Sequence, residues 1–178
     1  MTQQGRSLLE MLCVLFIIGV ITQNASASWS WLVAREQLAS LTNHLMSELR
    51  FAQHQALVHQ TAVTWCASPD KQHCSNDWHN LRLVFIDKNR DQERQPDEPI
   101  LKQFDALTQT ACAVWRSFRP RPGLTYTSTG MTDHQNGTFT LCIKNNNMLL
   151  VNQLVLTKLG RLRVVTQPDI PTPPACAD

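Results

Sequence analysis

The chain has 178 residues, which suits one short apolar segment and one domain of about 120 to 150 residues, large enough to bury its own core. Its formal charge is +2, so the chain as a whole is too nearly neutral for charge alone to identify a partner. The distribution says more. Residues 110–178 hold seven bases and three acids, a net of +4, whereas residues 66–109 hold six bases and eight acids, a net of −2. The C-terminal part is therefore the basic side.

The N-terminus consists of a short polar leader that ends in Gly5, followed by an almost unbroken apolar run to Ile21. A single acid, Glu10, lies inside this run and not beside it. A carboxylate among apolar side chains is costly, so we interpret Glu10 as a functional residue that pairs with a cation. The apolar stretch of about fifteen residues is short for a membrane span, which needs about twenty.

One long helix is predicted for the stretch from Leu8 to Gln60, which contains no proline and only one glycine, Gly19. An interruption is expected at most near residues 24–30, where small polar residues gather. Fifty helical residues would span about 75 Å. In the second half, apolar residues recur at three- and four-residue steps and polar ones such as Glu48 fall largely elsewhere, so we expect an apolar face that packs on a sheet. That face consists of Leu38, Leu41, Leu45, Leu49, Ala52, Ala56 and Leu57.

After Thr61 the pattern changes to short runs that are typical of β-strands. We expect strands at residues 62–66, 81–86, 100–104, 137–143, 149–156 and 161–165. Residues 145–147 are predicted to be a turn and residues 119–123 a loop, and residues 170–178, with three prolines, a tail that needs tethering. One long helix against an antiparallel sheet is an α+β arrangement.

Two disulfides are expected if the domain is exported to an oxidising compartment. Cys66 and Cys74 enclose a short polar loop and form the first expected pair. Cys142 and Cys176 are the second, which would tie the tail to a strand and leave Cys112 over. Sequence alone does not prove a pairing.

The N-terminal pattern of a glycine, four residues and a glutamate before an apolar run resembles the leader of type IV prepilins. The resemblance implies that a prepilin peptidase cuts between Gly5 and Arg6. Glu10 then becomes the fifth residue of the mature chain and pairs with the amino terminus of a neighbouring pilin subunit. The family usually has phenylalanine or methionine after the cut, and this chain departs from that pattern at Arg6.

The rest of the chain resembles one subgroup, the FimT/FimU minor pilins and the GspH pseudopilins of type II secretion. The order and spacing of several segments carry the resemblance: residues 49–56, 63–68, Cys74, Trp78, and residues 83–91, 139–142 and 160–163. It implies a type IV pilin fold with a leader at 1–5, a transmembrane and filament-core segment at 6–28 and a globular domain at 29–178. It also implies a single-pass protein of a Gram-negative inner membrane, with a periplasmic domain, that later enters a pilus at the cell surface.

The stretch Gly160-Arg161-Leu162-Arg163 points to the FimT branch, where such an element is associated with DNA binding in natural transformation. In a strand, Arg161 and Arg163 project to one face, and Gly160 permits a tight turn before them. Guanidinium groups fork onto phosphate oxygens, so the expected partner is double-stranded DNA, read through its backbone. We expect four further bases to extend the positive patch that Arg161 and Arg163 form. They are Lys158, Arg119, Arg121 and Lys144. The competing interpretation is that charges on an edge strand only deter aggregation.

Two other functions compete with DNA binding. One is a structural subunit, either a priming minor pilin or a GspH-like pseudopilin. The other is a periplasmic binding protein with an ordinary signal peptide, because residues 25–27 offer a small-residue cleavage site that would leave a mature terminus near Ser28.

Two groups of residues resemble metal sites, but a structural interpretation is favoured for both. The first would be a zinc site, with Cys66, His73, Cys74 and His79 as ligands. Their spacing matches no common zinc finger, and a disulfide between Cys66 and Cys74 is the simpler interpretation. The second would be a calcium loop, because acids and an amide alternate at Asp87, Asn89, Asp91 and Glu93, and Glu98 stands at the twelfth position. The loop lacks the glycine that an EF-hand has at its sixth position, so we favour a polar turn. No catalytic motif was found, so we expect no enzyme activity, metal, cofactor or small-molecule substrate.

Overall fold

The computed structural model describes residues 7–145 and 148–166. Helix α1, Leu8–His59, has 52 residues and a length of about 78 Å at 1.5 Å per residue. The Ser7 hydroxyl accepts a hydrogen bond from the Leu9 amide at 3.4 Å at the N-terminus, and Gln60 ends the helix in the left-handed conformation, with φ of 52°. The helix runs through residues 24–30 without the interruption that the sequence allowed.

In the part of the chain that the structure describes, eight strands form two four-stranded antiparallel sheets, where the sequence had predicted one sheet. The first sheet has the order β3-β2-β1-β5 and the second the order β4-β6-β7-β8. The strands β4 and β5 were not predicted. The bounds are β1 Val63–Ala67, β2 Arg82–Ile86, β3 Ile100–Phe104, β4 Ala111–Ser117, β5 Gly123–Tyr126, β6 Gly137–Asn145, β7 Met148–Leu156 and β8 Leu162–Val165.

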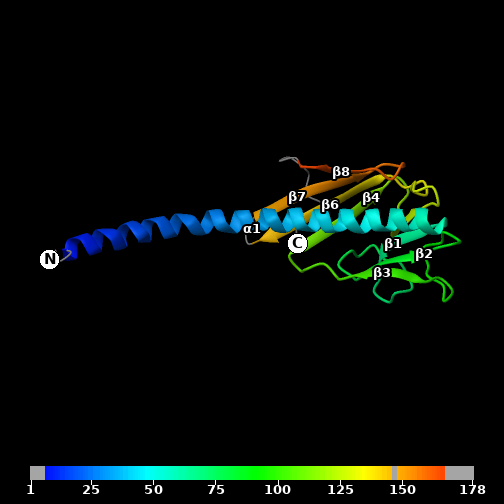
Figure 1. Ribbon diagram of the computed structural model, residues 1–178, viewed down its shortest axis with the longest axis horizontal. Helices are drawn as coiled ribbons and strands as arrows, with labels where there is room; N and C mark the ends of the chain where they lie inside the picture. The colour runs from blue at the N-terminus through cyan, green and yellow to red at the C-terminus, as the bar shows by residue number, and fades with distance from the viewer. Residues whose placement is uncertain (1–6, 146–147, 167–178) are drawn as a thin grey trace, which may run out of the picture.

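The second half of α1 lies across both sheets, in contact with β1 and β5 of the first and β6 and β7 of the second (Figure 1). Its predicted apolar face is buried from Leu38 to Ala56, whereas Leu57 is 46% exposed. Glu48, which the sequence pattern predicts to lie outside this face, is also buried. Its carboxylate forms a bidentate ion pair with Arg82 of β2.

Aromatic side chains connect the two sheets beneath the helix. The rings of Trp65 on β1 and Phe139 on β6 meet edge to face, with centroids 5.4 Å apart. Trp78 stacks on Trp65 at 4.7 Å, and Trp115 of β4 stacks on Phe139 at 4.3 Å. Such pairs add stability beyond the area that they bury, so the two sheets share one core.

The first half of α1 extends away from the sheets (Figure 1). The large apolar side chains from Leu8 to Val20 are exposed, from Leu8 at 83% to Val20 at 47%. The first buried residue of the core is Ala34. Within residues 7–145 and 148–166, no helical stretch combines the length and the hydropathy that crossing a membrane requires.

Within the described residues there are two disulfides, and one of them corrects a sequence prediction. Cys66 joins Cys74, as expected. Cys142 joins Cys112 and not Cys176. The reason is register, because Cys112 on β4 lies directly opposite Cys142 on β6 with the Cα atoms 5.2 Å apart, within bridging range. Cys176 lies outside the described residues. The bridge therefore connects two strands of one sheet and does not tether the tail.

Replacing Cys112 and Cys142 together by serine is expected to lower the free energy of unfolding by about 3 to 4 kcal/mol, because the bridge closes a loop of roughly thirty residues in the unfolded chain. Denaturant titration of the oxidised double variant and the parent measures this difference. Peptide mapping without reductant should recover the 112–142 cross-link, and a peptide that joins Cys142 to Cys176 instead would contradict the assignment.

Candidate nucleic-acid interface

The turn between β7 and β8 presents the glycine-arginine element. The Gly160 amide donates to the Thr157 carbonyl at 2.9 Å, and the Thr157 amide donates to the Arg161 carbonyl at 3.0 Å. Gly160 has a φ of +76°. A three-residue hairpin loop with its last residue in the left-handed region is a common way to join two strands, and glycine suits that position. The glycine therefore shapes the turn from which the arginines emerge.

The same glycine seats the turn against the rest of the domain. A Cβ atom added at Gly160 would lie 2.4 Å from Nε2 of Gln53 on α1 and 2.6 Å from the carbonyl oxygen of Gly130. Gln53 Nε2 already donates to that carbonyl at 2.8 Å. The amide and hydroxyl of Thr132 both donate to the Lys158 carbonyl, at 3.0 and 3.1 Å. The position of the hairpin is thus fixed from both sides.

Arg161 and Arg163 are both exposed. Arg163 pairs in register with Val155, whereas the neighbouring pair of Leu162 and Leu156 belongs to the face that packs in the core. Since successive side chains of a strand alternate between faces, Arg163 lies on the outer face of the sheet, opposite α1. Arg161 directly precedes β8 at the end of the turn.

A residue that the sequence analysis did not select continues this surface. Arg116 of β4 is exposed, and its register partner on β6 is Thr138. The set continues through Val155 on β7 to Arg163 on β8. We call this cross-strand set the arginine row. Its ends are three strand spacings apart, about 14 Å at roughly 4.8 Å each. Among the described residues, neither Arg116 nor Arg163 takes part in an ion pair. Arg116 was missed because β4 itself was not predicted.

A hollow lies over the ends of β6 and β7, within the arginine row. Thr138 and Val155 of the row line it, together with the exposed Lys158 of the turn. Two guanidinium groups therefore flank a recess that has an ammonium group at its rim. Arginine offers forked donors and lysine a mobile point charge, both suited to phosphate.

The other predicted bases are divided by the structure. Arg119 follows Ser117, the last residue of β4, at the same end of the sheet as the hairpin turn, and is exposed. Arg121 donates to the Arg90 carbonyl at 3.1 Å and so lies toward the loops of the first sheet. Lys144 lies near the opposite end of β6, in register with Leu149, about 20 Å from the row at 3.4 Å per residue. The structure therefore separates Lys144 from the patch to which it was assigned.

Of the N-terminal residues predicted to be functional, the structure describes Glu10 alone. Glu10 lies in the first turn of α1 and is exposed. Gly5 and Arg6 lie outside the described residues.

The candidate metal loops have structural contacts of their own. The Cys66 and Cys74 sulfurs are bonded to each other, and His73 Nδ1 lies 2.7 Å from Asp70 Oδ2. That contact raises the pKa of His73. Burial raises the pKa of Asp87, although its carboxylate accepts hydrogen bonds from Thr64 Oγ1 and the Gln92 amide. Both loops thus use their carboxylates to hold their own backbone in place.

Comparison with known proteins identifies the family. The family model for the type II transport protein GspH matches residues 41–160, which is more than half of the chain. The chain belongs to the GspH family. No curated protein sequence matches it closely enough to count as a relative.

Solved structures agree with this fold. The type IV minor pilin FimU of Pseudomonas aeruginosa superposes with a TM-score of 0.55 at 21% identity, over 80% of this chain and 96% of FimU. The minor pseudopilin EpsH of the Vibrio cholerae Type 2 Secretion System superposes with a TM-score of 0.50 at 14% identity, over 72% of this chain and 96% of EpsH. The GspH-family chain therefore has the type IV pilin fold, a long helix on antiparallel sheets.

Replacing Gly160 by alanine is expected to destabilise the domain by at least about 1 to 2 kcal/mol, the cost of a left-handed residue with a Cβ, plus the collision with the Gly130 carbonyl. Gly19→Ala is the matched control, because a Cβ there meets nothing within 4 Å. Thermal and denaturant unfolding of the two variants measures the difference. Equal stability of Gly160→Ala and the parent would show that the turn does not need glycine.

Proposed function

We propose that this protein is a minor pilin that enters a filament through α1 and binds double-stranded DNA for uptake in natural transformation, as a structural and binding subunit and not an enzyme. The observation that carries the DNA proposal is the arginine row, with exposed guanidinium groups at both ends on the face that α1 leaves free. Lys158 and Arg161 at the adjacent turn extend the positive surface.

The chemistry of the row fits a phosphate backbone. Its span of about 14 Å is comparable with the width of the B-DNA major groove, roughly 12 Å, so Arg116 and Arg163 would contact phosphates of the two strands that border one groove. The hollow is lined mainly by small polar and apolar side chains, with Asn136 and Lys158 as its larger polar groups, and in the described part of the chain no helix or ribbon projects from it to enter a groove and read base edges. Binding would therefore be insensitive to sequence and strongly dependent on salt.

We propose that the exposed apolar half of α1 packs against other pilin subunits, after a prepilin peptidase cuts between Gly5 and Arg6. Before assembly, residues 6–28 would hold the chain in the inner membrane with residues 29–178 in the periplasm. The filament would then carry the domain to the cell surface. The exposed apolar side chains from Leu8 to Val20 support this proposal, because such a surface is stable in water only when another apolar surface covers it.

Changing Arg161 and Arg163 together to glutamine is expected to weaken binding of a 30-base-pair duplex by about 10- to 100-fold near 50 mM salt, because two charge-assisted contacts are lost. The slope of log K against log salt should fall in magnitude by about 2, or roughly 0.9 for each phosphate contact. Fluorescence anisotropy of the domain from Trp31 onward, which contains every buried residue of the described core, measures both quantities.

The matched control removes the same charge elsewhere. Lys144→Gln with Arg50→Gln takes two exposed positive charges from outside the row and should leave the affinity within about twofold, because charges more than a Debye length away are screened. Arg116→Gln alone should reduce the salt slope by about 1. If the control pair weakens binding as much as the arginine pair, the attraction is general and the row is not the site.

A purely structural subunit is the second candidate, because the matching family model is that of a type II transport protein and EpsH is a pseudopilin. Such a subunit needs α1 and the sheets but no DNA surface. Absence of duplex binding even at 20 mM salt would favour this candidate, and the arginine row would then be surface charge or a subunit contact.

Replacing Glu10 by alanine is expected to keep the protein out of the filament, because its carboxylate would no longer pair with the amino terminus of a neighbour. Immunoblots of sheared filaments from the native host, against total protein, measure incorporation. Glu36→Ala, which removes an exposed carboxylate of the same helix beyond the apolar run, is the control. Equal incorporation of both variants would contradict the role given to Glu10.

A further inference from the structure

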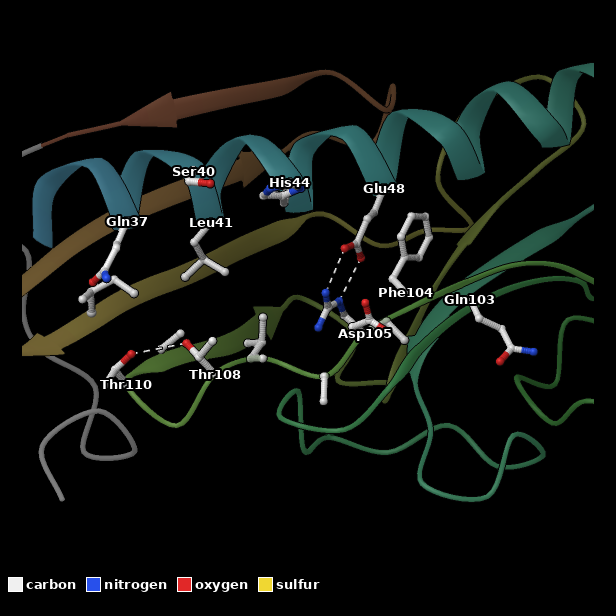
Figure 2. A pocket seen from close by; sticks show the side chains of 15 residues that line it. Gln37, Ser40, Leu41, His44, Glu48, Gln103, Phe104, Asp105, Thr108 and Thr110 are labelled. Carbon is white, nitrogen blue, oxygen red and sulfur yellow. Dashed lines mark hydrogen bonds and ion pairs between the residues drawn. The ribbon is translucent and has the colours of Figure 1, made fainter. Parts of the chain in front are cut away.

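A cavity of about 500 Å³ opens between α1 and the loop that joins β3 to β4 (Figure 2). Gln37, Ser40 and Leu41 of α1 lie on one side and residues 104–110 of the loop on the other. Its volume is within the range of ligand-binding pockets, about 300–1,000 Å³. The cavity borders Ala111, at the opposite end of β4 from the arginine row, so it is separate from the proposed DNA surface.

A buried ion pair forms part of the cavity wall. Arg82 donates through Nε and Nη2 to the two carboxylate oxygens of Glu48, both at 2.9 Å, and these side chains are only 6% and 4% exposed. Dashed lines in Figure 2 mark this pair below the labelled Glu48. Trp65 Nε1 donates to the same carboxylate at 3.0 Å. All three side chains are buried, so the pair is held rigidly.

The third nitrogen of this guanidinium group is buried without a hydrogen-bond partner among the described residues. Because a guanidinium is planar and its Nε–Nη2 edge faces Glu48, the Nη1 donors point away from the carboxylate. A buried N–H group without an acceptor is unfavourable, so this unsatisfied donor needs an explanation. Here the group belongs to a residue that lines a cavity large enough for a ligand.

The charge balance indicates the kind of acceptor. Arg82 and Glu48 already neutralise each other, and the other titratable groups of the lining are the carboxylate of Asp105 and the imidazole of His44. With His44 neutral, a carboxylate or phosphate in this cavity would add a negative charge that no cation of the lining matches. A neutral acceptor such as an amide carbonyl would satisfy Nη1 without that cost. Apolar side chains complete the walls: Leu41, Phe104, Leu107 and Ile143.

The surroundings favour an extended polypeptide as the source of that carbonyl. β3 is an edge strand of the first sheet and β4 an edge strand of the second, and the last residue of β3 and the first of β4 both border the cavity. An edge strand has main-chain groups that are free to pair with another extended chain. The cavity thus lies at the ends of two edge strands and combines an apolar pocket with a donor that suits a neutral acceptor.

We propose that this cavity binds an extended peptide segment of another polypeptide chain. The segment places one backbone carbonyl on Nη1 of Arg82 and one apolar side chain between Leu41 and Leu107. This site does not depend on DNA binding, and a pilin that fails to bind DNA would retain it.

The test uses N-acetyl-leucine methylamide, a neutral mimic of a peptide residue, titrated into the full chain in non-ionic detergent. We expect saturable shifts of the Arg82 side-chain and Trp65 indole signals in nitrogen–proton NMR spectra. N-acetyl-leucine, which carries the same side chain and a carboxylate, should bind at least tenfold more weakly. Absence of saturable shifts would overturn the proposal, as would tighter binding of the carboxylate.

Two variants locate the binding. Ser40→Trp places a large ring on an exposed position of the cavity rim and should weaken methylamide binding at least tenfold. Ser47→Trp, exposed on the same helix but outside the cavity lining, should bind as the parent does. Since both substitutions are on the surface of α1, neither depends on removing the buried ion pair. Equal binding by the two variants would show that the probe binds elsewhere.

Discussion

Burial of one face of α1 is the constraint on which the rest of the structure depends. The two sheets form separate hydrogen-bonded ladders, and both pack on the same helical stretch. Leu45 and Leu49 are fully buried there, each with a stabilisation of about 1.5 to 3 kcal/mol from burial. Without this helix the sheets would be joined by the aromatic contacts of Trp65 and Trp78 with Phe139 and by the hydrogen bonds of Gln135 with β5. The domain therefore cannot be separated from the second half of its helix, whereas the first half is exposed.

The same helix also positions the candidate DNA surface. Gln53 of α1 holds the Gly130 carbonyl, and Gly160 packs against both, so the hairpin that ends in Arg161 is fixed relative to the helix axis. The arginine row lies on the opposite face of the sheet from α1. A subunit built in this way can pack its helix in a filament and still expose its arginines.

Periodicity predicted the elements whose signal is local. The buried face from Leu38 to Ala56 and strand β3 were both read correctly, because spacing alone identifies them. Strand β4 was missed because its alternation is weak: Ala111 and Ala113 face the core, and Trp115 is only half buried. Division into two sheets depends on long-range pairing, which periodicity does not record.

The site was predicted in part for the same reason. The glycine-arginine element is contiguous in sequence, so its turn was recognised, but Arg116 joins it only through the register of three strand pairs. Lys144 was predicted to belong to the DNA-binding patch because of its charge. The structure separates it from the arginine row because it lies near the far end of β6. The Cys142 pairing failed similarly, because Cys112 became its neighbour only once β4 was placed beside β6. The burial of Glu48 likewise depends on Arg82, which is distant in the sequence.

The central claim is that DNA lies on the outer face of the β4-β6-β7-β8 sheet, across the arginine row. The most direct measurement is nitrogen–proton NMR mapping of the labelled domain during titration with a short duplex. The account predicts that shifts concentrate at the amides of Arg116, Thr138, Val155 and Arg163 and at the Lys158 turn, while Lys144 remains unchanged. Shifts that centre on another face, or none at 20 mM salt, would contradict it.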